Sequence, residues 1–398
     1  MSAARLEETM TSTLPRRAGS DRDDVRMLTM GVEEELLLVD ADSGRPRLNS
    51  AAVVAGARDA GLDLQLELSR CQVETATSVC TRIDELRREL RVSRAVAAAA
   101  AASAGSRLLA AAVPPLETTP PGALTDAARY RRMARHFGAV TDQVICGCHV
   151  HIGVPDREVA VQVCNHLRPW LPALLALTAN SSVTAGADTG YASWRHIQWG
   201  RWASGGPPPY FRSARHYDDV VAMMLDAGVV LDPAMVYWDI RLSPHLPTLE
   251  IRICDVPATI EETVTAAALV RGLVSTALTA VHRGDPAPRL EAERLEAACW
   301  RAAHEGTDGH GMDPLTQRPV PAARLLGSLL AHVRPGLEET GDFTSTRASV
   351  RRILRRGNGA RRQRRALAMS RTAADFVAEL ARITVEDCAP SAPPPPAR

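Results

Sequence analysis

The stretch MLTMGVEEELLLVD, residues 27–40, is the part of the sequence that decides the fold. It is short and apolar, and the turn-forming run ADSG follows it at residues 41–44, which predicts a β-strand. Successive side chains of a strand point to opposite faces, so Glu33 and Glu35 share one face while Glu34 lies on the other. Two neighbouring carboxylates repel each other unless they face water or hold a cation between them. The strand therefore predicts either an exposed acidic face or a metal site.

Three further predicted strands place charged or metal-binding groups on one face in the same way. These residues are Gln72 and Glu74, with Glu67 nearer the start, in residues 63–77; His149 and His151 in residues 144–154; and Glu250 and Arg252 in residues 248–254. A solvated strand face normally mixes Thr, Ser and both charges, whereas these positions are almost all Glu and His. This concentration of carboxylates favours Mg²⁺, which prefers oxygen ligands that it shares with phosphate.

Other interpretations of these residues stay open from the sequence alone. His149 and His151 have the His-x-His spacing of zinc hydrolases, which would make the chain a metal-dependent amide hydrolase. Arg252 beside Glu250 is either a structural ion pair or the group that stabilises charge on a transferring phosphoryl group. A non-catalytic protein that binds an acid or a nucleotide would carry the same residues without turnover.

The remaining pattern predicts an α+β fold, a largely antiparallel sheet with helices packed on one side. Further strands are expected over residues 106–113 and 235–240, helices over 83–104, 125–138 and 157–179, an irregular loop over 184–209, and four or five helical segments over 260–386. No Gly-x-Gly-x-x-Gly follows a predicted strand, so a doubly wound nucleotide-binding sheet is not expected. We expect one catalytic domain over residues 27–386, with a disordered lead-in over 1–26 and a disordered Pro-rich tail over 387–398.

Composition excludes several classes of protein. All 47 basic residues are arginine, which removes the P-loop lysine, the kinase strand lysine and Schiff-base chemistry. The eight scattered cysteines indicate a reduced, cytoplasmic protein rather than a disulfide scaffold. A net charge of +1 without aromatic interleaving argues against nucleic acid as a partner, so the eight arginines over residues 351–365 are interpreted as a solvated helix face. No apolar stretch long and uncharged enough for a membrane span is expected.

Seven segments occur in the order found in a known family. They are GVEEE (31–35), QVET (72–75), CGCHVHIG (146–153), DTGY (188–191), LEIR (249–252), WRAA (300–303) and the run from Gly359-Ala360 to Gln363-Arg364. Over residues 27–386 the chain resembles the carboxylate–amine ligases of the glutamate–cysteine ligase type 2 group (YbdK-like). The resemblance implies a glutamine-synthetase-like fold, in which an antiparallel sheet forms a funnel that holds ATP, Mg²⁺ and the acid.

The resemblance also implies roles for individual residues. Those expected to bind Mg²⁺, with Mn²⁺ as a substitute, are Glu33, Glu35, Glu67, Glu74, His149 and Glu250. Arg252 would contact the phosphates, with Glu250 beside it and Arg195 in the loop associated with the acid. His149, His151 and Arg364 are further candidates for contact with the nucleotide.

The expected reaction is ATP-dependent amide-bond formation through an acyl phosphate, with a small carboxylic acid and an amine as substrates. Residues 111–115 and 181–183 depart from the family pattern, which places a His and a Phe where this chain has Val113 and Pro115, and another Phe where it has Val183. If these segments line the substrate site, they favour an acid other than glutamate or an amine other than cysteine; the alternative is that they are differences in packing. A cytoplasmic homodimer is expected, without a membrane partner.

Overall fold

The computed structural model describes residues 28–117, 122–313 and 316–388. The predicted lead-in over residues 1–26 and nearly all of the predicted tail lie outside these ranges. Strand β1 (Met30–Asp40) begins three residues later than predicted and ends where the sequence placed its end. The other strands of its sheet are β2 (Gln65–Leu66), β3 (Gln72–Ala76), β4 (Ser106–Leu109), β5 (Gly147–Gly153), β8 (Ile240–Leu242) and β9 (Thr248–Asp255).

These strands form one antiparallel sheet in the order β2-β3-β1-β5-β9-β8, with β4 pairing with the end of β1. The strands that carry the acidic and histidine motifs, β3, β1, β5 and β9, are therefore direct neighbours in the middle of the sheet. Two small hairpins lie apart from it: β6 (Val183–Thr184) with β7 (Ala187–Asp188), and β10 (His310–Met312) with β11 (Pro319–Pro321).

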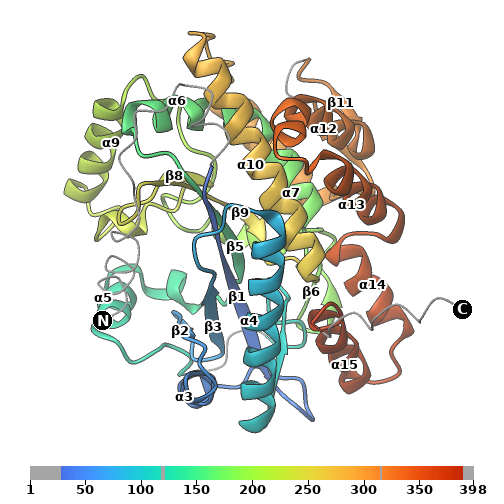
Figure 1. The fold of residues 1–398 in the computed structure, drawn as a ribbon. Coiled ribbons are helices and arrows are strands. Elements are labelled where there is room, and N and C mark those ends of the chain that lie inside the picture. The colour runs from blue at the N-terminus through green and yellow to red at the C-terminus, as the bar shows by residue number, and fades with distance from the viewer. Residues whose placement is uncertain (1–27, 118–121, 314–315, 389–398) are drawn as a thin grey trace, which may run out of the picture.

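Two long helices cover the face of the sheet that carries Glu34. They are α4 (Ile83–Ser103) and α10 (Ile260–His282), which Figure 1 shows crossing in front of the central strands. Helix α10 is long and apolar enough to cross a membrane by length and composition, but 78% of that window is buried inside the fold. Core helices of soluble proteins meet the same criterion, so α10 is a core helix here.

Glu34 is wholly buried under these helices. Arg94 of α4 donates from Nε to Glu34 Oε2 at 2.8 Å and from Nη2 to Oε1 at 2.6 Å, and the Thr263 hydroxyl of α10 donates to Oε1 at 2.6 Å. The predicted split of Glu33 and Glu35 from Glu34 is confirmed. On that face the Glu34 carboxylate joins β1 to both helices.

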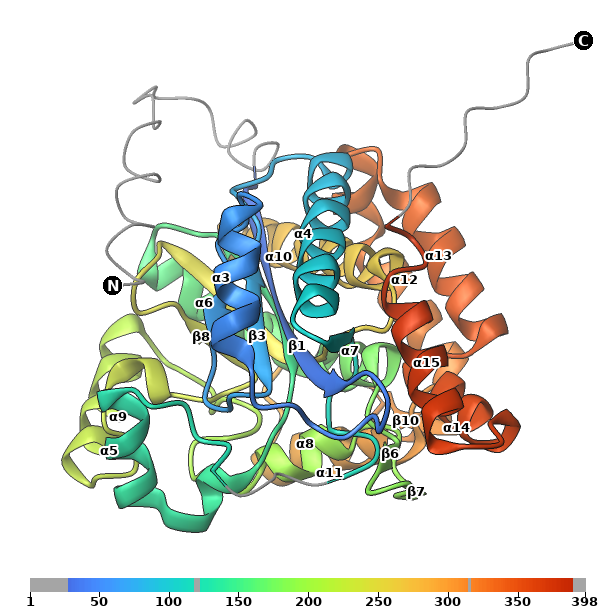
Figure 2. The same cartoon turned by 90° about the horizontal axis from the view of Figure 1, so that it is seen from below.

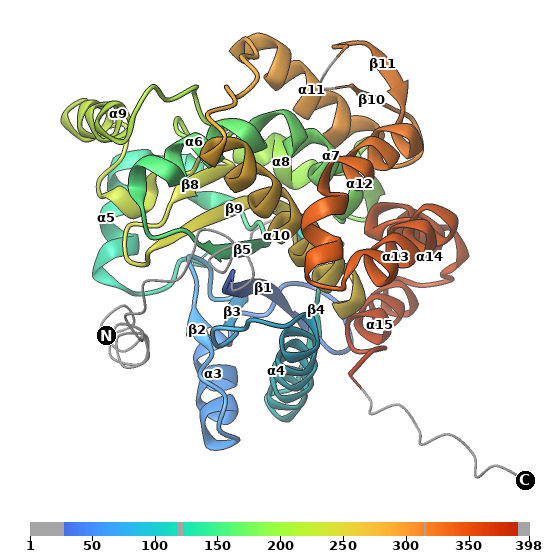
Figure 3. The ribbon, with the colours of Figure 1, turned by 45° about the horizontal axis from the view of Figure 1, so that its top comes forward.

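The other helices surround the sheet, as the turned views in Figures 2 and 3 show. They are α3 (Ser50–Asp59), α5 (Ala128–Phe137), α6 (Arg157–Leu167), α7 (Leu171–Thr178), α8 (Trp194–Trp199), α9 (Ala214–Asp226), α11 (Ala292–Glu305), α12 (Ala322–Glu339), α13 (Phe343–Arg356), α14 (Gly359–Met369) and α15 (Ala373–Thr384). Helices α12 to α15 group together beside α10 (Figure 1). The α+β fold is confirmed.

Several boundaries differ from those predicted from sequence. The expected helix over residues 157–179 is interrupted by a short turn at Arg168–Trp170, where Pro169 cannot supply a backbone N–H. The expected loop over residues 184–209 contains α8, and the strand expected over residues 235–240 lies at Ile240–Leu242. The helical region after residue 260 has six helices and a hairpin within its described part. The cysteines of the described ranges are unpaired, and all but Cys388 are buried.

Candidate active site

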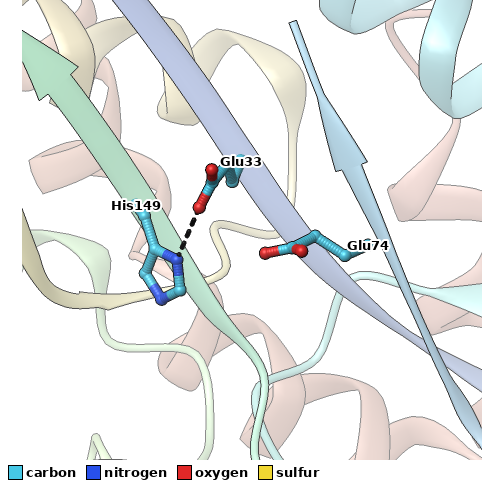
Figure 4. Close-up of side chains that lie close together, drawn as sticks. All are labelled: Glu33, Glu74 and His149. Carbon is cyan, nitrogen blue, oxygen red and sulfur yellow. Dashed lines mark hydrogen bonds and ion pairs between the residues drawn. The ribbon is translucent and has the colours of Figure 1, made fainter. Parts of the chain in front are cut away.

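The register of the sheet brings the predicted metal-binding residues together. Glu35 stands opposite Glu74 of β3, and Glu33 stands opposite His149 of β5. Figure 4 shows Glu33, Glu74 and His149 pointing toward one another from three adjacent strands. On the other edge of β5, His151 stands opposite Glu250 of β9. A period-2 side-chain pattern on four neighbouring strands thus builds one continuous polar face.

Three overlapping groups on this face have potential ligand atoms within 4.8 Å of one another. The groups are Glu33 with Glu74 and His149; Glu33 with His151 and Glu250; and Glu35 with Glu67 and Glu74. All six residues predicted as metal ligands are included, and His151 joins them. The grouping gives them the geometry of a metal site, and their role as ligands remains a prediction.

The carboxylates on this face repel one another more than the nearby histidines and arginines compensate. Burial and then the charge of Glu33 raise the pKa of Glu74 well above its usual value. Burial and then the charge of Glu35 raise the pKa of Glu67 to about 7. Glu33 behaves oppositely: although burial favours its neutral form, His151 and His149 lower the pKa of its carboxyl. A bound cation would relieve the repulsion among these carboxylates.

The two histidines each place Nε2 near a carboxylate without a hydrogen bond: His149 Nε2 lies 3.7 Å from Glu35 Oε1, and His151 Nε2 lies 3.5 Å from Glu33 Oε1. His149 Nδ1 lies 3.1 Å from Glu33 Oε2, and His151 Nδ1 lies 3.0 Å from the Thr248 hydroxyl. Their Nε2 atoms are buried and make no hydrogen bond to any residue of the described ranges. Carboxylate oxygens nevertheless dominate each group, and this donor set suits Mg²⁺ or Mn²⁺ better than the three-ligand site of a zinc hydrolase. The residues therefore fit a hard divalent cation.

Glu250 is held by two arginines at the end of this face. Arg241 of β8 donates from Nε to Glu250 Oε2 at 2.7 Å and from Nη2 to Oε1 at 3.1 Å, and Arg252 Nη1 also contacts Oε1. Burial opposes ionisation of Glu250, but Arg241 and then Arg252 lower the pKa of its carboxyl well below the usual value. Arg241 was missed from sequence, although its place one strand from Glu250 would have indicated it had the β8–β9 register been known.

A bulge positions Arg252. The pairing of β5 with β9 shifts between Cys148 and Val150, so that two residues of β9, Arg252 and Ile253, stand opposite His149. Bulges of this kind often redirect a side chain beside an active site. The Arg252 guanidinium lies 5.8 Å from the centre of the Trp199 ring and 6.0 Å from that of Tyr237, so two aromatic rings support it.

These residues open into one cavity. Besides Glu33, Glu35, Glu67, Glu74, His149 and Arg252, its lining includes Leu68, Gln72, Arg129, Tyr130, Met133, Gln143, Ile145, Trp199, Trp202, Ala234, Tyr237 and Arg241. Gln143 is buried, and both polar atoms of its side-chain amide lack a hydrogen-bond partner within the described chain. Sequence reasoning missed Gln143, which lies just before β5, and the aromatic wall, which comes from α5, α8 and the segments after α8 and before β8.

Four predicted site residues do not line the cavity. His151 and Glu250 still belong to the groups of potential metal ligands, whereas Arg195 and Arg364 do not. Arg195 is buried, and its guanidinium donates to the carbonyl oxygens of Arg252 and Ile253 at 3.2 and 3.4 Å. A Cβ on Gly147 would come within 2.5 Å of Arg195 Nη2, so a glycine is needed at residue 147 for this close approach. Arg364 instead bonds to Asp188 at 2.9 Å and to the carbonyl of Tyr191 at 3.0 Å. Both arginines thus bond to other parts of the chain, and their contacts with the acid and the nucleotide stay predictions.

The structure decides between the two interpretations of residues 111–115 and 181–183. Val113 and Val183 are 1% and 0% exposed and belong to the hydrophobic core. Pro115 is buried as well, and neither segment lines the described cavity. The departures at residues 111–115 and 181–183 are therefore differences in packing.

Comparisons with known proteins agree with this fold and site. The model of glutamate–cysteine ligase family 2 (GCS2) matches residues 29–382. A Nocardia farcinica protein named "Putative glutamate--cysteine ligase 2-1" is 53% identical over 364 residues, which cover 91% of this chain and 94% of that protein. A Mycolicibacterium vanbaalenii protein named "Putative glutamate--cysteine ligase 2-2" is 50% identical over 361 residues, covering 90% of this chain and 98% of that protein.

Two solved structures share the fold at low sequence identity. A bifunctional glutathione synthetase from Pasteurella multocida superposes with a TM-score of 0.69 at 15% identity, covering 92% of this chain and 53% of that one. A glutamate–cysteine ligase from Francisella tularensis in complex with AMP gives a TM-score of 0.67 at 13% identity, covering 92% and 89%. Together with the acidic strand face, the comparisons define a carbon–nitrogen ligase of the glutamate–cysteine ligase type. The chain belongs to glutamate–cysteine ligase family 2, which confirms the resemblance seen in the sequence.

Proposed function

We propose that this protein is an ATP- and Mg²⁺-dependent carboxylate–amine ligase that activates a small carboxylic acid as an acyl phosphate. The observation that carries the proposal is the strand face on which Glu33, Glu35, Glu74 and His149 converge beside Arg252. Mg²⁺ bound to such a face neutralises the charge of the ATP phosphates. Mn²⁺ would serve the same donor set.

The residues of the chain then act by positioning and by charge. In the first step the carboxylate of the acid attacks the γ-phosphoryl group and ADP leaves. Arg252 stabilises the charge on the transferred phosphoryl group, and the chain has no lysine that could do so. Trp199 and Tyr237 flank the Arg252 guanidinium and limit the access of water to it. In the second step the amine attacks the acyl carbon, phosphate leaves, and an amide bond is formed.

We further propose that the acid or the amine is less polar than glutamate or cysteine. Two of the arginines that line the described cavity, Arg241 and Arg252, are paired with Glu250, and Arg129 bonds to Asp232 across an exposed contact of 3.2 Å. A second carboxylate group on the substrate would have to displace Glu250 or Asp232 from one of these arginines. The cavity offers instead the neutral amide of Gln143 and an aromatic wall.

A hydroxylamine trap tests the proposed reaction. The purified protein is incubated with ATP, MgCl₂ and a panel of acids, and hydroxylamine captures any acyl phosphate as a hydroxamate. We expect ADP, phosphate and hydroxamate to form together. Efficient, saturable formation of γ-glutamylcysteine would contradict the proposed substrate preference and leave the ligase proposal intact.

The setting of the enzyme is also part of the proposal. The family and the unpaired cysteines of the described ranges support a cytoplasmic enzyme. A homodimer stays a prediction, which the mass in solution by light scattering tests.

A further inference from the structure

A second acidic side chain lies beside Arg252 with no assigned role. Asp239 precedes β8 and is 0% exposed, and neither of its carboxylate oxygens has a hydrogen-bond partner among the described residues. The backbone N–H of Arg252 donates to the Asp239 carbonyl at 2.8 Å. Since Ile240 pairs with Ile251, continuation of the register places Asp239 directly opposite Arg252 on the same face. Directly opposed side chains have Cβ atoms about 4.5–5.5 Å apart, which an Asp–Arg pair can span.

Two buried arginines lie near Asp239, and the charge of Arg195 lowers the pKa of its carboxyl more than the charge of Arg252 does. Arg195, the other cation nearby, lies 3.9 Å from Asp255, whose carboxylate accepts hydrogen bonds from Asn180, Ser181 and Ser193. Arg241 holds Glu250 with two hydrogen bonds. Arg252 shares Glu250 through Nη1, while its own Nε is buried and lacks a partner within the described chain.

The contact between Arg252 and Glu250 would change if the proposed function is correct. A cation bound to Glu250 competes with Arg252 for the same carboxylate, because both interact with its oxygens. Arg252 would then be a buried charge without a partner, which is costly. Burial raises the pKa of Asp239 to about 7, so this carboxyl can ionise at little cost when a positive charge turns toward it.

We propose that Asp239 is a positioning residue. Once a cation has bound to Glu250, Asp239 holds the Nε edge of the Arg252 guanidinium, so that the Nη atoms face the reacting phosphoryl group. The inference rests on the proposed function, because it needs a ligand at Glu250. Asp239 itself would touch neither ATP nor the acid, since it does not line the described cavity.

The first test is a kinetic double-mutant cycle with Asp239→Asn and Arg252→Lys, using ATP, MgCl₂ and the acid found by hydroxamate trapping. Asp239→Asn keeps the size of the side chain and removes its charge. We expect kcat to fall about tenfold or more in the wild-type background, in the range seen when a supporting hydrogen-bond partner is lost, and less than twofold in the Arg252→Lys background. An equal fall in both backgrounds would show that Asp239 does not act through Arg252. Asp218→Asn, at an exposed ion pair with Arg157, is the matched control with unchanged kcat.

The second test needs no turnover and therefore separates this inference from the proposed function. The urea midpoints of wild type, Asp239→Asn, Arg252→Gln and the double variant are compared in EDTA and in MgCl₂. We expect little coupling between residues 239 and 252 in EDTA, where Arg252 contacts Glu250, and a clear stabilising coupling in MgCl₂. Equal coupling in both buffers, or none in either, overturns the inference. If the variants show this coupling but the wild-type protein does not turn over ATP, the proposed function is refuted and the inference about Asp239 stands.

Discussion

Replacing Glu34 by glutamine should destabilise the protein without touching the cavity. Glu34 and Arg94 are both fully buried, and the carboxylate accepts three hydrogen bonds, two from Arg94 and one from Thr263. Arg94 also donates to the carbonyl oxygens of Ala258, Pro257 and Thr384. Burial alone would lower the pKa of Arg94, but the charge of Glu34 raises it, so the arginine stays charged. The substitution therefore leaves a buried cation without its counter-ion.

The expected magnitude follows from this geometry. Removing one partner of a buried ion pair costs about 3–5 kcal/mol, against a total stability of about 5–15 kcal/mol for an ordinary domain. The measurement is urea unfolding of the metal-free protein in EDTA, followed by circular dichroism. Glu34→Gln should shift the midpoint far below that of wild type.

The matched control is Glu74→Gln, on the cavity face of the same sheet. Burial and the charges of Glu33, Glu67 and Glu35 already disfavour the ionised form of Glu74, so the loss of its charge should leave the midpoint in EDTA unchanged or raised. A wild-type midpoint for Glu34→Gln, or an equal fall for both variants, would refute this assignment of the two faces.

Four further predictions concern the candidate metal site and the cavity. Glu33→Gln and Glu250→Gln should each lower ATP-dependent kcat by at least about 10–100-fold, while the circular dichroism spectrum stays that of wild type. A variant that keeps the wild-type kcat would exclude its residue as a metal ligand. Since the pKa of Glu67 is raised to about 7, the folded protein keeps a proton that the unfolded chain loses, so metal-free stability should fall as pH rises from about 4.5 to 7. By the same linkage Mg²⁺ should bind more tightly at pH 8 than at pH 6 and release protons, and calorimetry showing no proton release would contradict this. Gln143→Leu should raise the KM for acid or amine several-fold and leave nucleotide affinity unchanged, and a loss of nucleotide affinity alone would place Gln143 elsewhere.

Strand alternation was enough to predict the polar face of the sheet. Glu33, Glu35, Glu74 and His149 meet because each lies on a strand whose side chains alternate, and the pairing of those strands completes the face. The α+β fold followed from the order of the predicted elements, because strands dominate the first two-thirds of the chain and helices the last third, without regular alternation. The sequence could not reveal what covers the opposite side of the sheet, so the ion pair between Glu34 and Arg94 was not predicted.

Residues placed by long-range packing were the ones that sequence reasoning missed or misplaced. Arg241 joins Glu250 only through the β8–β9 register, and Gln143 reaches the cavity from the segment before β5. Arg364 was predicted from its motif to contact the nucleotide, and in the structure its guanidinium forms an ion pair with Asp188 of β7. Val113 shows the same limit, because a change within a motif does not reveal whether its side chain faces substrate or core.

The most direct test of the proposed reaction follows oxygen from the acid into phosphate. The protein is given ATP, MgCl₂, an amine and the trapped acid labelled with ¹⁸O in its carboxylate, and the products are analysed by mass spectrometry. An acyl phosphate that the amine opens at carbon transfers one labelled oxygen to inorganic phosphate, with ADP as the nucleotide product. Unlabelled phosphate, AMP as product, or amide cleavage without ATP would contradict the account.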